Sequence, residues 1–233
     1  MAATPLGLFS RLVSFVGGIL APREPPAAET VERQLAALNA QFDTNVTRLA
    51  QGLANNTVSL GQFDGAMRSA IRQHHLAVAV VAQGGTQNAT PQTLALAQGQ
   101  VNVQMGYFDA WMRELQQQAA AGELPSVNYI ANRARMYGKA AKATAERASV
   151  QGGGLPDLPF HPAEKTPCKF NCKCRWNIRV IDAVNGSYDC YYRLGDAEHC
   201  SVCVARARAA NPLRVRRGQI VNAEKYQAAH LYA

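Results

Sequence analysis

Residues 173–194 read "KCRWNIRVIDAVNGSYDCYYRL", which is two alternating runs joined by an Asn-Gly pair. In the first run, every second residue is apolar and its neighbours are polar: Cys174, Trp176, Ile178 and Val180 share one face. An Asn-Gly between two alternating segments is the strongest short-range sign of a β-hairpin. The stretch therefore predicts a small β-hairpin in the C-terminal part of the chain.

The segments around this hairpin complete a small domain. Residues 197–211, "AEHCSVCVARARAAN", predict a short helix, with Asp196 as its cap and Pro212 as its end. We therefore expect residues 155–212 to form a Cys-rich α+β module, a β-hairpin plus a short helix, resembling a zinc ribbon. Residues 213–233 are basic and then polar, and we expect them to form a C-terminal tail.

All six cysteines of the chain lie in this module, from Cys168 to Cys203. A module of this size buries little core and usually needs a covalent or metal cross-link. Zinc takes four ligands, commonly as two close pairs. Cys200 and Cys203 form one pair, and the other comes from the first cluster. The predicted metal ligands are Cys168, Cys172, Cys174, Cys200 and Cys203, whereas Cys190 reads as a packing residue.

Two other interpretations of the cysteines stay open, disulfides and unliganded buried thiols. The chain begins without a basic secretion signal, which disfavours structural disulfides. A catalytic zinc is not expected. The stretch from His161 and Glu164 to Cys168 and Cys172 imitates a deaminase motif, but its spacing is wrong and its two halves lie too close together. No other nucleophile system or phosphate loop is evident, so we expect no enzyme.

Residues 30–150 carry a helical pattern. Apolar residues recur every three or four positions along the first stretch: Val31, Leu35, Leu38, Phe42, Val46, Leu49 and Leu53. Ser59 can cap a second helix, which includes the apolar run "LAVAVVA" (76–82). Pro91 opens a third helix and Pro125–Ser126 a fourth. The pattern predicts a bundle of about four helices, so the protein as a whole is mainly α.

The two ends of the chain differ in character. Residues 1–29 combine an amphipathic segment with a Pro-rich linker, and we expect them to dock on a partner protein without spanning a membrane. Basic and acidic residues balance over residues 1–122, so the whole net charge of +8 lies in residues 123–233. That asymmetry suggests an anionic partner such as nucleic acid, or simply a solvated basic face.

Several stretches together carry a family resemblance. The helical segments "LGQFDGAMRSAIRQHHLAVAVVAQGG", "GYFDAWMRELQ" and "ANRARMYGKAAKATAERA" precede "HPAEKTPCKFNCKCRW" and "EHCSVCVARARAANPL". Over roughly residues 55–212 the chain resembles tailed-phage minor head proteins, the head-morphogenesis family similar to the F protein of phage Mu. His161–Pro162 matches the family's His-Pro element, Cys172 and Cys174 its Cys-Arg-Cys element, and Cys200 with Cys203 its Cys-x-x-Cys pair. An insertion containing Cys168 separates the first two elements.

The resemblance implies a structural virion protein at the head or head–tail junction, assembled in the bacterial host cytoplasm. It implies docking to the portal or major capsid protein in multiple copies, a role in head morphogenesis, and contact with packaged DNA or help in its ejection. The cysteine spacing described above adds a structural zinc to this expectation. The alternative interpretation is a cellular nucleic-acid-binding helical protein with a zinc-ribbon module.

Overall fold

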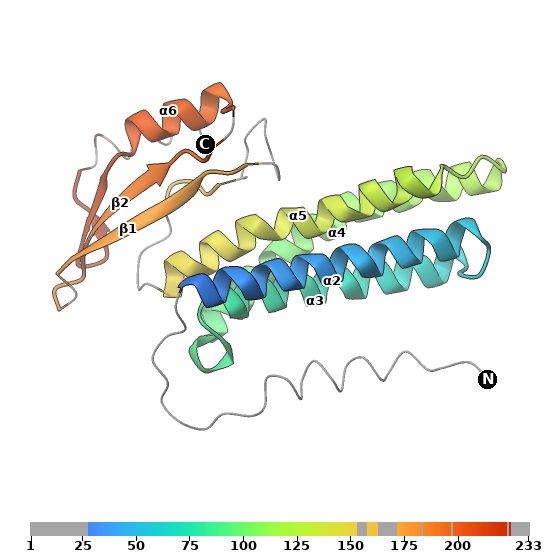
Figure 1. Ribbon diagram of the computed structural model, residues 1–233, viewed down its shortest axis with the longest axis horizontal. Coiled ribbons are helices and arrows are strands. Elements are labelled where there is room, and N and C mark those ends of the chain that lie inside the picture. The colour runs from blue at the N-terminus through green and yellow to red at the C-terminus, as the bar shows by residue number, and fades with distance from the viewer. Residues whose placement is uncertain are drawn as a thin grey trace.

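A computed structural model describes residues 28–152, 158–162, 172–182, 184–196, 198–222 and 224. Four long helices lie side by side, and an antiparallel sheet with a short helix follows at the end of the bundle where the last long helix finishes (Figure 1). The predicted architecture, a helical bundle followed by a small Cys-rich α+β module, is confirmed. The expected amphipathic segment falls on residues 1–27, outside the described residues.

The bundle consists of α2 (Ala28–Ala54), α3 (Leu60–Ala82), α4 (Pro91–Ala120) and α5 (Val127–Gly152), with a 3-10 turn, η1 (Thr86–Asn88), between α3 and α4. Ser59 caps α3 as predicted: its hydroxyl accepts from the backbone N–H of Gln62, whose side chain accepts from the N–H of Ser59. This reciprocal pair satisfies two donors that the first turn of a helix leaves unpaired. Thr90 caps α4 in the same way, just before Pro91.

The four helices bury a common core at the apolar positions of the pattern. Its largest members are Phe42, Phe63, Phe108, Trp111 and Tyr137. The run 76–82 is helical, with no exposed residue, as predicted. The first part of α2 differs from the rest of its seam, because Val31, Leu35 and Leu38 are only half-buried. The bundle core therefore begins at Phe42.

The C-terminal sheet has the order β1-β2-β3-β4, with β1 (Arg175–Asp182), β2 (Ser187–Arg193), β3 (Leu213–Arg216) and β4 (Gln219–Ile220). The predicted hairpin is β1 and β2, paired antiparallel across the Asn-Gly turn. Its register sets Trp176 opposite Tyr192 and Ile178 opposite Cys190. One face of the hairpin thus carries the large apolar side chains, as the alternation requires.

Two features of the module differ from the prediction. Residues 213–220, expected in a tail, form β3 and β4, and Leu213 and Val215 are fully buried. The helix α6 (Ser201–Ala209) is shorter than predicted, and its cap is Cys200 rather than Asp196. The sulfur of Cys200 accepts from the backbone N–H of Cys203 at 3.4 Å, so a thiol caps the helix in place of the expected aspartate.

The module is attached to the bundle through α5. Val150, near the end of α5, is buried in the same apolar cluster as Trp176 and Tyr192. The ammonium group of Lys142 donates to the backbone carbonyl of Cys172. None of the helices in the described part of the chain is both long enough and apolar enough to cross a membrane.

Candidate metal centre

Three aromatic rings, those of Phe160, Trp176 and Tyr192, pack together in the buried core of the module. Phe160 stacks on Trp176 with ring centroids 5.4 Å apart, and Tyr192 meets both rings edge-on. The indole N–H of Trp176 donates to the carbonyl of Phe160 at 3.1 Å, which fixes the segment before the cysteines against β1. These contacts hold residues from three separate segments together in one buried cluster.

Three thiols converge beside these rings. The sulfurs of Cys172, Cys174 and Cys203 all lie within 4.8 Å of one another, and those of Cys172 and Cys203 are 4.0 Å apart. Cys172 and Cys174 immediately precede β1, where alternate residues point to the same face. Cys203 comes from the first turn of α6. The fold thus brings two thiols from one segment and one from another to a single point.

The cluster is buried, and its surroundings disfavour an uncompensated thiolate. All three side chains are at most 2% exposed. A hydrogen bond in which the Cys174 thiol donates to Cys172, together with burial and the neighbouring sulfurs, raises the pKa of Cys174 strongly. Burial, and then a hydrogen bond with Cys200, raise the pKa of Cys203 to about 12. Without a cation Cys174 and Cys203 hold their protons, and a bound dication would favour their thiolate forms.

The arrangement fits a metal of the zinc class. In a tetrahedral thiolate site the metal–sulfur distance is about 2.3 Å, which places neighbouring sulfurs about 3.8 Å apart. The Cys172–Cys203 separation is close to that value, and the sulfur of Cys174 lies within 4.8 Å of both. The five described cysteines form no disulfide among themselves. The cluster could therefore hold a metal such as zinc.

The predicted ligands divide into three groups. Cys172, Cys174 and Cys203 are brought together. Cys200 lies beside Cys203, half-exposed and outside the tight group of three. Cys168 lies outside the described residues. The sixth cysteine, Cys190, is fully buried in the apolar core of the module, which agrees with its predicted role in packing.

Two polar neighbours of the cluster were not anticipated. The hydroxyl of Tyr192 lies 3.7 Å from the sulfur of Cys203. Tyr192 is two residues after Cys190 on β2, so the alternation of the strand could have predicted that both side chains share the inner face of the sheet. Glu146 on α5 lies near Lys142 and the backbone of Trp176, and burial raises its carboxyl pKa to about 7. Nothing in the sequence signals that contact, because it depends on how α5 meets the sheet.

Comparison with protein-family models, with curated proteins and with solved structures found no match.

Proposed function

We propose that this chain is a structural minor head protein of a tailed bacteriophage, acting in head morphogenesis at the portal or capsid. One observation carries the proposal. The cysteine elements that resemble the head-morphogenesis family are far apart in sequence, yet their sulfurs meet in one buried cluster behind a helical bundle. Cys172 and Cys174 supply one element, and Cys203 the other. The convergence of these elements in space supports the resemblance to that family's module.

In this proposal the cluster is a structural zinc site. Cys172, Cys174 and Cys203 hold the ion, and Cys200 is the fourth ligand from its position next to Cys203. Zinc bound there would cross-link the segment before β1 to the start of α6 and contribute directly to the folding of a small module. Burial of the three sulfurs suits a closed structural site rather than a catalytic site with an open position.

The bundle supplies the docking surface for the portal or major capsid protein in this proposal. Three apolar residues at the start of α2, Val31, Leu35 and Leu38, stay partly exposed in the isolated chain. They follow the amphipathic segment 1–29 that the sequence predicts to bind a partner. Partly exposed apolar residues at this end of α2 fit docking during assembly into a virion head in the host cytoplasm.

Co-assembly tests the proposal directly. The full chain is expressed with the portal and major capsid proteins of the same genome, and the complexes are separated by size. We expect it to co-sediment with portal rings or capsid shells, and to carry about one zinc per chain by metal analysis. Absence from both assemblies would overturn the assignment to the phage head. Absence of zinc from correctly folded protein would overturn the metal site alone.

The alternative, a cellular nucleic-acid-binding protein, is favoured by one observation, the excess of arginine on the solvent face of the sheet. It predicts DNA binding without affinity for portal or capsid proteins, so the same co-assembly experiment separates the two functions.

A further inference from the structure

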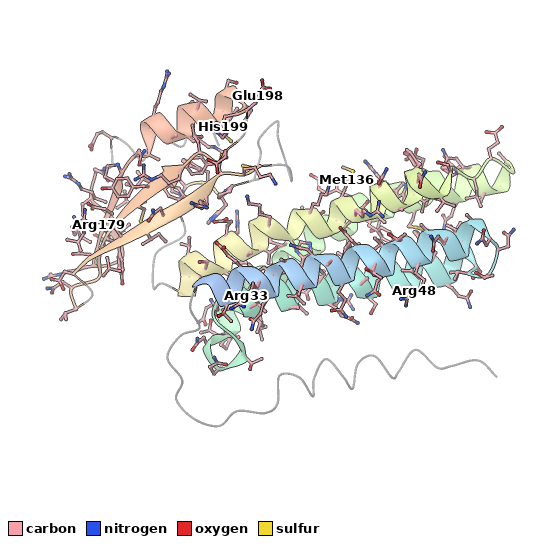
Figure 2. All side chains as sticks on the ribbon, in the orientation of Figure 1. Arg33, Arg48, Met136, Arg179, Glu198 and His199 are labelled. Carbon is pink, nitrogen blue, oxygen red and sulfur yellow. The ribbon has the colours of Figure 1, made fainter. Side chains whose placement is uncertain are left out.

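The sheet has two faces of opposite character. The inner face carries the cysteine cluster and the rings of Trp176 and Tyr192. The alternation and the strand register place five arginines on the outer face: Arg175 and Arg179 on β1, Arg193 on β2, and Arg214 and Arg216 on β3. Figure 2 shows Arg179 on this module, well away from the helical bundle. Four of the five arginines are exposed, and Glu146 of α5 lies near one of them, Arg175, on the edge strand β1.

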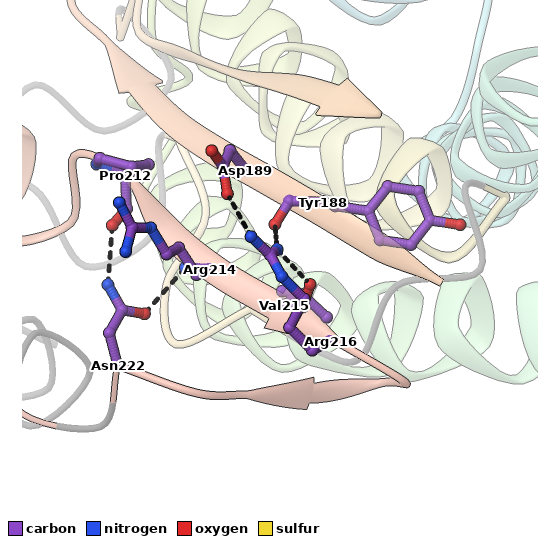
Figure 3. A network of polar contacts seen from close by, with 7 residues as sticks. All are labelled: Tyr188, Asp189, Pro212, Arg214, Val215, Arg216 and Asn222. Atoms are coloured by element: carbon purple, nitrogen blue, oxygen red, sulfur yellow. Dashed lines mark hydrogen bonds and ion pairs between the residues drawn. The ribbon is translucent and has the colours of Figure 1, made fainter. Parts of the chain in front are cut away.

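The same face holds two aspartates, both already engaged. Asp189 accepts from Arg216 at 3.2 Å, and Arg216 also donates to the backbone carbonyl of Tyr188, as Figure 3 shows. Asp182, beyond the β1 bulge, accepts from the side chain and backbone of Asn185 in the turn. The acids thus hold one arginine and one turn in place, and the face keeps a positive excess.

One pair on this face is unfavourable in isolation. The β1–β2 register sets Arg175 directly opposite Arg193, and two like charges at such positions destabilise a sheet. The guanidinium of Arg193 lies over the ring of Tyr191, 4.9 Å from its centroid, which fixes that charge in position. An anion bound between the two arginines would relieve their repulsion. The arrangement is therefore better suited to a bound polyanion than to bare solvent.

We propose that the outer face of this sheet binds the sugar–phosphate backbone of double-stranded DNA without reading its sequence. Guanidinium groups bind phosphate oxygens in a two-pronged geometry, and arginines on three adjacent strands present several such groups at once. Because Arg193 covers Tyr191, the aromatic ring that the described strands place on this face, base stacking of single strands is disfavoured. The choice of duplex DNA rests on the proposed role in a phage head.

Fluorescence anisotropy of a labelled 30-bp duplex, titrated with the full chain at several salt concentrations, tests this surface. The test variant is Arg179→Gln/Arg214→Gln, which removes two exposed charges of the outer face. The matched control is Arg72→Gln/Arg113→Gln, which removes two exposed charges of the bundle. Thermal unfolding of both variants confirms that they are folded.

We expect the wild-type chain to bind the duplex, and the slope of log K against log salt to correspond to about three to four phosphate contacts. The sheet variant should bind about tenfold more weakly and lose about two units of the salt slope, whereas the bundle variant should change less than twofold. Equal weakening by both variants, no binding by the wild type, or tighter binding of a 30-nucleotide single strand would overturn the inference. Co-assembly of the sheet variant with the portal protein separates the two proposals. If the variant still co-assembles but no longer binds DNA, both proposals are supported. If the variant no longer co-assembles, the proposal that the outer face serves only to bind DNA is overturned.

Discussion

The sulfur atoms of Cys172 and Cys203 lie 4.0 Å apart although the two residues are 31 positions apart in the chain. Cys172 precedes the β1–β2 hairpin and Cys203 follows it. A ligand that joins these two positions therefore closes the whole hairpin into one loop. This closure lowers the conformational entropy of the unfolded chain and so raises the free energy of unfolding of the module. The metal-site predictions follow from this relationship.

Replacing one of the converging cysteines should remove the metal, whereas replacing the cysteine outside the cluster should not. We expect Cys172→Ser and Cys203→Ser to lose most of the bound zinc, because a serine hydroxyl is a poor substitute for a thiolate ligand. Cys190→Ser is the matched control, since Cys190 is equally buried in the same module. It should keep its zinc while losing about 1–3 kcal/mol of stability from a buried, unpaired hydroxyl. Metal analysis and thermal unfolding measure both effects; equal loss of zinc in all three variants would contradict the assigned ligand set.

Chelation should unfold the module before the bundle, and the two tryptophans of the chain report on the two parts separately. Trp176 lies in the module core and Trp111 in the bundle core. In the Trp111→Phe variant, we expect a zinc chelator to shift the remaining emission to longer wavelength as Trp176 meets water. In the Trp176→Phe variant, the emission of Trp111 should stay unchanged. An unmoved Trp176 signal after complete zinc removal would show that the module does not depend on the metal.

The elements that the sequence predicted well are those that repeat a local signal. The α2 seam recurs at helical spacing through Phe42, Val46 and Leu53, and Ser59 adds a cap with a known partner position. The hairpin is fixed by an alternating pattern on each side of Asn185–Gly186, where Gly186 adopts a φ of 57°. Each of these signals spans enough residues to outweigh competing conformations.

The elements that the sequence missed depend on long-range contacts. Strand β3 has four residues and β4 only two, so "LRVR" is too short for its alternation to stand out from a basic tail. The convergence of Cys172 and Cys174 with Cys203 was equally hidden, because spacing alone allowed three cysteines to form the first pair. Among the described cysteines this convergence follows from the position of Cys172 and Cys174 just before β1, with α6 supplying Cys203.

Acid should destabilise the bundle through two adjacent histidines of α3, His74 and His75. His75 Nδ1 lies 2.7 Å from the hydroxyl of Thr144 and Nε2 lies 3.3 Å from the carbonyl of Tyr137, contacts that suit the neutral ring. Burial lowers the pKa of each histidine to about 4, and the neighbouring His74 further lowers that of His75. The unfolded chain, in which histidine has a pKa of about 6.5, therefore binds more protons between those values. Stability is full above pH 6.5 and falls as the pH drops toward 4.

At pH 5 the expected loss is about 2 kcal/mol per histidine relative to pH 7. Urea unfolding at both pH values measures it in the wild type and in His75→Gln. The glutamine variant is less stable at pH 7 but should lose less on acidification, because one titrating group is gone. Identical pH dependence in His75→Gln and the wild type would contradict the assignment.

A methyl group at Gly138 should destabilise the bundle where α5 crosses α2. A Cβ built on Gly138 would lie 2.6 Å from Cε1 of Phe42 and even closer to Cδ1. The ring of Phe42 has little freedom to move away, because it is buried and lies against His74 with ring centroids 4.7 Å apart. We expect Gly138→Ala to lower the free energy of unfolding by about 1–3 kcal/mol through overpacking, despite alanine's better helix propensity.

Gly106→Ala separates packing from propensity. Gly106 is in α4, and a Cβ there would meet no atom within 4 Å. The same chemical change should therefore stabilise the chain by about 0.5–1 kcal/mol, because only the helix preference acts. Urea unfolding of both variants measures the two changes in the free energy of unfolding, and zinc content is measured alongside. If α5 packs on α2 through Gly138, the two changes have opposite signs and metal binding is unchanged. A stabilising effect of Gly138→Ala would mean that α2 and α5 do not make this close approach in solution.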